Sequence, residues 1–336
     1  MPVIKKTILV VFTLVLIVAL GEGLILAGIH LDPIRTAALL AALAVILVPF
    51  IELTNPVVVR LLRQRAVESK WAAVGTPLLL LTPYLVLACG MRAFSVVALA
   101  KLVAYIAAPT LLLFPDRMHR AERVGWRDFA AMLALALPIS AGWLRGIWIW
   151  PADRVFTEAE ELYFFLPLFC VCVGGYSFMV IRNLEGIGYR LGFRKPDFID
   201  GASNFAAFTL LAIPLGYALH FIRFRPHSVP LFEMGFQLFA IYLTIAIPEE
   251  FLFRGVLQNF LSKSLSGPRH AIYALLIASV IFGASHLHHA PVPNWRYAIL
   301  ATLAGLFYGN AFRTRQRLSS AALTHALVDT IWHFWF

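Results

Sequence analysis

Long apolar runs, each close to the length of a membrane-crossing helix, follow one another along most of the 336-residue chain. A helix needs about 20 apolar residues to cross the hydrocarbon core of a bilayer. Hydrophobic residues make up 60% of the sequence and charged residues only 14%, whereas a soluble domain devotes about a quarter of its residues to charge. The sequence therefore predicts an all-α, polytopic transmembrane helix bundle with about eleven spans, within a range of about eight to eleven. The expected spans are residues 7–29, 33–51, 72–89, 93–114, 129–150, 162–181, 202–222, 231–262, 270–287, 296–312 and 318–335.

The basic residues gather in every second loop between these runs. The alternate loops hold fewer cations, and the loop at residues 153–161 is acidic. Because Lys-rich and Arg-rich loops stay on the cytoplasmic side, the alternation predicts a cytoplasmic N-terminus. We expect a multi-pass protein of a bacterial inner membrane, with the lipid bilayer as its first partner. The net charge of +10 is explained by these loops, so no nucleic-acid partner is expected.

A polar stretch at residues 182–200 is the best candidate for a domain boundary. Before it, ionisable residues mostly sit at the ends of apolar runs; after it, they occur inside them. Ionisable residues within a membrane are expensive and mark functional sites. We therefore expect residues 1–200 to form N-terminal transmembrane helices of unknown role, and residues 201–336 to form a catalytic membrane domain.

Two adjacent glutamates lie deep in the run 231–262. Each costs about 2.5–3.5 kcal/mol on membrane-insertion scales, so a compensating partner is expected. Glu250 and Arg254 are four residues apart, on nearly one face of a helix, and can form an ion pair. Glu249 points elsewhere and lacks that partner, while Pro248 removes one helical hydrogen bond beside the acids. A plain Glu–Arg bridge near a helix end would also explain this segment taken alone.

Further polar residues interrupt two later runs. His286 ends the run 270–287, and His325 and Asp329 are four residues apart within the run 318–335. Measured at 1.5 Å per helical residue from the flanking basic loops, these residues and Glu249 fall in one layer of the membrane. We therefore expect Glu249, His286 and His325 to line a single polar cavity.

Such a set supports the hydrolysis of a carbonyl compound by water. A glutamate without an arginine partner, close to a histidine, can share the deprotonation of a water molecule. A second histidine on another helix can donate a hydrogen bond to the developing oxyanion. The simplest substrate is a peptide bond, and neither a serine nor a cysteine nucleophile is required.

The motifs EExxxR (Glu249 to Arg254), FxxxH (Phe282 to His286) and HxxxD (His325 to Asp329) resemble those of the CPBP family, which contains the type II CAAX prenyl endopeptidases and the bacterial Abi proteins. The resemblance covers about residues 202–336. It implies an intramembrane endopeptidase without metal or other cofactor, in which Glu249 and His286 activate the water. Glu250 and Arg254 would position the first carboxylate, and His325 with residue 329 would form the oxyanion site.

One position departs from the prenyl endopeptidase, which has asparagine where this chain has Asp329. An ionised aspartate cannot donate a hydrogen bond to an oxyanion. Asp329 must then either orient His325 through a hydrogen bond or stay protonated, and we favour the orienting role. The resemblance leaves the substrate open between a prenylated peptide and a protein with a C-terminal sorting tail.

Two other classes of function use the same residues. A zinc-dependent membrane metalloprotease could take Glu249, His286, His325 and Asp329 as ligands, although the sequence lacks an HExxH helix. A proton-coupled transporter also needs buried Glu, His and Asp, although no inverted repeat is evident. A catalytically idle membrane scaffold is the third alternative.

Overall fold

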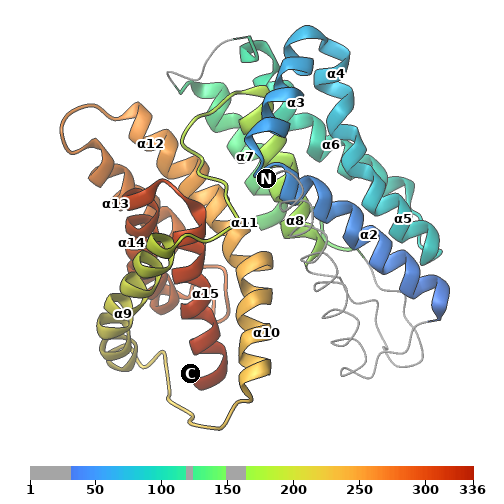
Figure 1. Ribbon diagram of the computed structural model, residues 1–336. Coiled ribbons are helices and arrows are strands. Elements are labelled where there is room, and N and C mark those ends of the chain that lie inside the picture. Colours follow the sequence, from blue (N-terminus) through green and yellow to red (C-terminus); the bar gives the residue numbers. More distant parts are fainter. Residues whose placement is uncertain (1–31, 119–123, 149–163) are drawn as a thin grey trace. The chain divides into compact units, whose positions relative to one another are not determined.

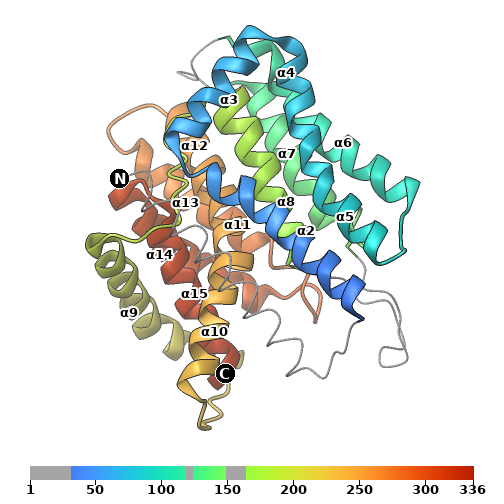
Figure 2. The same cartoon turned by 45° about the vertical axis from the view of Figure 1, so that its right-hand side comes forward.

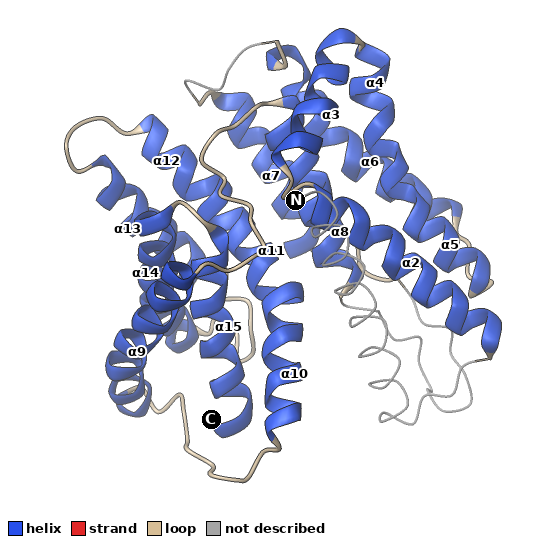
Figure 3. Ribbon diagram, viewed as in Figure 1, coloured by secondary structure: helices blue, strands red, loops and turns tan. Residues whose placement is uncertain are grey.

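A computed structural model describes residues 32–118, 124–148 and 164–336. Every regular element in these ranges is a helix (Figure 3), which confirms the predicted all-helical fold class. The expected first span, residues 7–29, and the acidic loop at 153–161 lie outside the described residues.

The chain divides into two compact units. Among the described residues, the first contains 32–118, 126–148 and 164–183, and the second consists chiefly of Leu184–Phe336. The candidate site residues all belong to the second unit. The boundary at residue 200 separates the chain by expected function and not by packing, and it stays a prediction.

The first unit is built from short and medium helices that succeed one another with few loops. Its elements are α2 (Pro33–Glu52), α3 (Pro56–Glu68), α4 (Lys70–Gly75), a 3₁₀ segment (Thr76–Leu81), α5 (Thr82–Gly90), α6 (Val96–Leu113), a 3₁₀ turn (Phe114–Asp116), α7 (Trp126–Ser140), α8 (Phe165–Gly174) and a π-helical segment (Gly175–Ile181).

Small residues and one buried ion pair hold this unit together. Helices α2 and α5 pack closely where Gly90 faces Ala38, since a Cβ at Gly90 would collide with that side chain. The guanidinium of Arg182 donates to the carboxylate of Asp128 at 2.6 Å, and both side chains are buried. A buried pair of this kind is tolerated in an apolar interior only because each charge has a partner.

Helix α7 is shorter than the expected span 129–150, which is therefore wrong in its second half. The helix ends at Ser140. The amide of Trp143 donates to the carbonyl of Pro138, and Gly142 has a φ of +68°. This is the hydrogen-bond pattern of a glycine-terminated helix, in which glycine takes the left-handed conformation at little cost.

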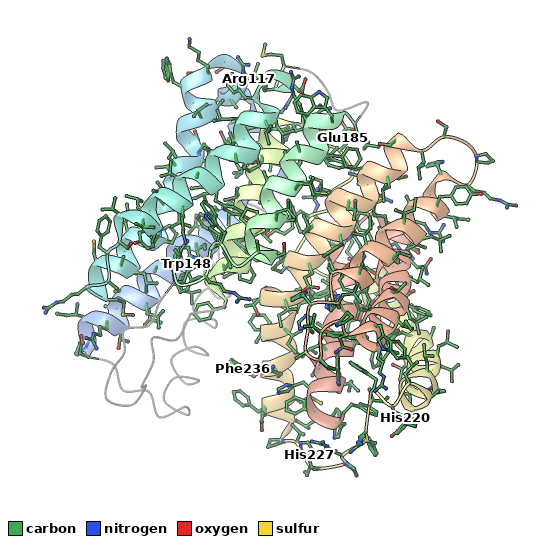
Figure 4. The ribbon with its side chains drawn as sticks, turned by 180° about the vertical axis from the view of Figure 1, so that it is seen from behind. Arg117, Trp148, Glu185, His220, His227 and Phe236 are labelled. Atoms are coloured by element: carbon green, nitrogen blue, oxygen red, sulfur yellow. The ribbon has the colours of Figure 1, made fainter. Side chains whose placement is uncertain are left out.

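The second unit carries α9 (Lys195–Ala218), α10 (Leu231–Ile241), α11 (Ile247–Glu250), α12 (Asn259–Ser264), α13 (His270–Ala284), α14 (Trp295–Arg315) and α15 (Leu318–Trp335). Helix α15 contacts α9, α14 and α10, and Figure 1 shows it between them. Helix α14 also packs along α13. The connector between α9 and α10, marked by His220 and His227 in Figure 4, is held to the end of α15 by a hydrogen bond from the Arg225 amide to the Trp335 carbonyl.

Helices α10, α11 and α12 form one continuous path (Figure 2). Two π-helical segments, Tyr242–Ala246 and Phe251–Gln258, join them. Pro248 has no amide hydrogen, so the carbonyl four residues earlier loses its helical donor. A wider π turn directly precedes this position, and such turns recur at functional sites. The hydrogen bond lost at Pro248 therefore falls in a short α-helical turn that carries both glutamates and lies between the two π-helical segments.

A row of polar contacts ties the beginning of α9 to α14 and α15. Arg317 Nε lies 2.8 Å from Asp197 Oδ2, and Arg315 Nε lies 2.6 Å from Asp200 Oδ2. The side-chain N–H of Asn310 donates to Oδ1 of Asn204 at 3.0 Å. The polar stretch expected at 182–200 is thus partly helical, because its last six residues begin α9.

Five of the described helical stretches are long and apolar enough to cross a membrane: Pro33–Glu52, Lys70–Gly90, Val96–Asp116, Lys195–Ala218 and Leu231–Ser264. Two shorter apolar stretches, Phe165–Ile181 and His270–Ala284, accompany them. The larger number of spans and the cytoplasmic N-terminus stay predictions.

Candidate active site

The predicted ion pair between Glu250 and Arg254 is present. Arg254 Nε lies 3.1 Å from Glu250 Oε2, and neither side chain is exposed to solvent. Arg254 Nη2 also donates to the carbonyl of Gly305 at 3.2 Å, and its guanidinium lies 4.6 Å from the centre of the Phe282 ring. The charge of Glu250 is therefore balanced within the protein, as the spacing of four residues predicts.

His325 lies on the other side of the same carboxylate. Its Nδ1 is 2.9 Å from Glu250 Oε1. A carboxylate paired to arginine accepts hydrogen bonds, so Nδ1 carries a proton. His325 Nε2 faces two further acids, at 3.3 Å from Asp329 Oδ2 and 3.9 Å from Glu249 Oε2.

The two glutamates differ sharply in their surroundings. The side chain of Glu250 has no exposed surface, whereas that of Glu249 is 37% exposed. Glu249 also lines a cavity inside the second unit. Its carboxylate makes no short ion pair with Arg254, so it is the member of the pair that can meet a ligand.

His286 takes the tautomer of a base. Its Nδ1 lies 2.8 Å from the carbonyl oxygen of Phe282, in the preceding turn of α13. Because a carbonyl only accepts hydrogen bonds, Nδ1 carries a proton, and in the neutral ring Nε2 then keeps its lone pair. The neighbouring hydroxyl of Ser285 donates to the same carbonyl at 2.7 Å, which occupies its proton.

A cavity of about 400 Å³ brings these groups together. Its polar wall contains most of the predicted site residues: Glu249, His286, His325 and Asp329, together with Thr209, His289, Tyr297 and Tyr308. The remaining wall is apolar and comes mainly from Phe205, Phe208, Ala212, Ile213, Phe221, Ile222, Leu300, Val328, Ile331, Trp332 and Phe336. The expected convergence of Glu249, His286 and His325 on one cavity is confirmed, while Glu250 and Arg254 lie behind the wall. Among the described residues, no group of three or more His, Cys, Asp or Glu side chains could hold a metal ion.

Two tyrosines of α14 complete the wall, and the sequence motifs do not include them. The ring of Tyr308 stacks on the imidazole of His325, with centres 4.5 Å apart and planes at 16°. The ring of Tyr297 meets His286 edge to face at 4.6 Å. Their spacing of eleven residues corresponds to about three helical turns, so both lie on one face of α14. This spacing is the one feature of the sequence that could have indicated that both tyrosines belong to the site. Aromatic residues at such a spacing are equally typical of an ordinary helix interface.

The fold and cavity define a class: a helical membrane protein with a carboxylate, an imidazole and a second carboxylate–imidazole pair around an internal chamber. Residues 231–331 match the family model described as type II CAAX prenyl endopeptidase Rce1-like. The match confirms the resemblance that the three sequence motifs predict, and it includes all of them. With the apolar helices it marks the chain as an integral membrane protein. No curated protein and no solved structure matches the chain in the same comparisons.

Proposed function

We propose that the second unit is an intramembrane endopeptidase in which Glu249 and His286 activate a water molecule. The observation that carries the proposal is the contrast between the two glutamates: Glu250 is buried against Arg254, and Glu249 opens onto the cavity. His286 lines the same cavity, and in its neutral form the proton on Nδ1 leaves Nε2 unprotonated. A carboxylate and a neutral imidazole on one cavity are suited to take the proton of an attacking water.

In this mechanism His325 stabilises the oxyanion. Its Nδ1–H is fixed by Glu250, so the ring presents Nε2 to the cavity. A proton on Nε2 then donates to the negative oxygen of the tetrahedral intermediate. Asp329 lies 3.3 Å from this nitrogen. Its carboxylate can orient the Nε2–H in the resting site, and the oxyanion replaces it as the acceptor during the reaction. Glu250 and Arg254 act by holding His325 and the Glu249 segment in place.

The substrate is a peptide or protein that reaches the cavity from the bilayer. The apolar side of the cavity suits a hydrophobic residue or chain next to the scissile bond. The matching family is described by its action on prenylated CAAX sequences, so a prenylated peptide is the first candidate. A protein with a hydrophobic C-terminal sorting tail meets the same chemical requirement.

The proposal includes the topology expected from the sequence. The chain is a multi-pass protein of about eleven spans, with a cytoplasmic N-terminus and a bacterial inner membrane as its location. Residues 1–200 supply transmembrane helices of unknown role, and residues 201–336 supply the catalytic domain. Cysteine-accessibility labelling of the basic loops in whole cells checks the orientation; labelling of those loops from outside would contradict it.

Cleavage of a defined peptide by the purified protein in liposomes tests the function. We expect mass spectrometry to detect two products whose masses sum to that of the peptide plus one water molecule. A prenylated CAAX peptide and its unprenylated form, offered in parallel, separate the two substrate classes. Absence of cleavage of both peptides and of a membrane-anchored sorting-tail protein would contradict an endopeptidase.

A further inference from the structure

The oxyanion site of the proposed function is short of a hydrogen-bond donor. Two donors usually stabilise the tetrahedral intermediate of acyl transfer. His325 Nε2 is one, but the residue beside it is Asp329, whose Oδ2 lies 3.3 Å away. An ionised carboxylate accepts hydrogen bonds and donates none. A second donor must therefore come from elsewhere on the cavity wall.

Tyr308 is placed to supply it. It lines the cavity together with Glu249, His325 and Asp329, and its ring lies directly against the imidazole of His325 at a centre-to-centre distance of 4.5 Å. The residue is only 2% exposed, so its hydroxyl has little contact with bulk solvent. A donor in such a water-poor site is worth more than the same donor in water.

The hydroxyl of Tyr308 differs from those of other buried tyrosines in having no hydrogen-bond partner among the described residues. The hydroxyls of Tyr84, Tyr105, Tyr176 and Tyr242 donate to the backbone carbonyls of Ser95, Leu135, Ala73 and Leu191, respectively. Buried tyrosines ordinarily find such a partner, because an unpaired buried hydroxyl is costly. A tyrosine hydroxyl kept free on the wall of a cavity is available to a ligand.

We propose that Tyr308 is a catalytic residue whose phenolic O–H donates the second hydrogen bond to the oxyanion; this assignment rests on the proposed function. Water adds to the carbonyl carbon of the scissile peptide, and its proton passes to the Glu249/His286 pair. The carbonyl π electrons move to oxygen, where His325 and Tyr308 donate. The carbon–nitrogen bond then breaks, the amine takes up the proton, and a carboxylic acid and an amine are released.

The other tyrosine of the wall packs against a different imidazole. Tyr297 packs against His286, His289, Phe221 and Trp332, with ring centres 4.6, 5.2, 5.5 and 5.1 Å away. It therefore lies beside the base, whereas Tyr308 lies beside the imidazole that faces the oxyanion. This separation makes Tyr308 the donor and leaves Tyr297 as a packing residue.

The ring and the hydroxyl of Tyr308 have separable roles. The ring stacks on His325 and lies 5.6 Å from the Arg254 guanidinium, so removing it would also disturb the site. Tyr308→Phe keeps the ring and removes only the oxygen. Tyr308→Leu removes both, and Tyr273→Phe makes the same chemical change on α13 at an exposed position outside the cavity wall.

The experiment measures kcat and KM for peptide cleavage in liposomes, with thermal unfolding. It compares the wild type with these three variants, Tyr297→Phe, Glu249→Gln and the double variant Tyr308→Phe/Asp329→Asn. We expect Tyr308→Phe to lower kcat by about 10²- to 10³-fold, with KM and the melting temperature near the wild-type values. Tyr273→Phe should match the wild type. Asp329→Asn, added to Tyr308→Phe, should restore part of kcat because its amide N–H₂ is a new donor beside His325.

The outcomes separate the two proposals. Full activity in Tyr308→Phe, with an inactive Glu249→Gln, would overturn the role of Tyr308 and leave the proposed function standing. The same result with an inactive Tyr308→Leu would reduce Tyr308 to a support for the His325 ring. A loss of kcat in Tyr297→Phe instead of Tyr308→Phe would also overturn the assignment. Full activity in Glu249→Gln would overturn the proposed function itself, whatever Tyr308→Phe does.

Discussion

Glu250 joins His325 to Arg254: one carboxylate oxygen lies 2.9 Å from His325 Nδ1, and the other lies 3.1 Å from Arg254 Nε. This relationship connects the path of α10–α12 to α15 across the centre of the second unit. Oε1 of Glu250 is thereby hydrogen-bonded, and Oε2 lies in the ion pair with Arg254. In the proposed mechanism, the chemistry of the two adjacent glutamates therefore falls to Glu249, which lines the cavity.

Glu250→Gln is expected to act through stability as well as rate. The substitution leaves the charge of Arg254 buried and unbalanced, and breaking a buried ion pair costs about 3–5 kcal/mol. The melting temperature in detergent should fall, and the cleavage rate with it. Replacing Arg254 with methionine as well removes the stranded charge, so the double variant should recover much of the stability and little of the activity.

Thermal unfolding and cleavage rates for Glu250→Gln and the double variant provide the measurement. A Glu250→Gln variant with wild-type stability and no activity, together with an active Glu249→Gln variant, would reverse the roles of the two glutamates. An unstable double variant would show that Arg254 is needed for more than balancing Glu250.

The sequence predicted the parts of this site that depend on spacing within one helix. The i, i+4 pairs Glu250–Arg254 and His325–Asp329 are both in contact, because helical geometry alone brings them together. The contact between Glu250 and His325 joins residues 75 positions apart, and no local pattern encodes it. Tyr308 was not predicted for the same reason, because its proposed role depends on the packing of α14 against other helices.

Hydropathy alone also predicted the end of helix α7 wrongly. The apolar character of residues 129–150 continues past Ser140, so hydropathy favoured one long span. The helix ends there because Gly142 takes a left-handed backbone conformation, with φ +68°. Such a residue closes a helix even where the following residues are apolar. Helix α3, Pro56–Glu68, lies in a basic stretch between two expected spans, so hydropathy did not indicate it. Most of the other described helices follow the predicted apolar runs, because length and hydropathy favour them there.

Asp197 should contribute more to stability than its neighbour Asp200, although both bind an arginine. The Asp197 side chain is 1% exposed and accepts hydrogen bonds from Arg317 Nε and from the amide of Arg194. Asp197→Asn is expected to lower the free energy of unfolding by about 2–3 kcal/mol, less than the full cost of a broken buried pair, because Arg317 keeps its bond to the Gly192 carbonyl.

Asp200→Asn is the matched control. Its arginine partner is 45% exposed, and a pair of this kind contributes less than about 1 kcal/mol. Thermal unfolding of both variants in one detergent makes the comparison. Equal losses would show that the row of polar contacts stabilises α9 as a unit and that burial does not rank its members.

Chelators should leave peptide cleavage intact. In the proposed mechanism the proton of the attacking water passes to Glu249 and His286, so no metal ion is needed to activate it. Elemental analysis of the purified active protein, alongside rates measured before and after treatment with a chelator, checks this prediction. Activity that disappears with chelator and returns with added zinc would contradict this prediction and favour the alternative of a zinc-dependent metalloprotease.

The cleavage rate of Glu249→Gln tests the central claim most directly. The substitution removes the base and keeps the shape of the side chain, and the partly exposed carboxylate of Glu249 makes no ion pair shorter than 3.9 Å. The protein should therefore fold and unfold as the wild type does while its cleavage rate in liposomes falls by about 10²- to 10⁴-fold. Cleavage at the wild-type rate by a correctly folded Glu249→Gln variant would contradict the assignment of Glu249 as the residue that activates water.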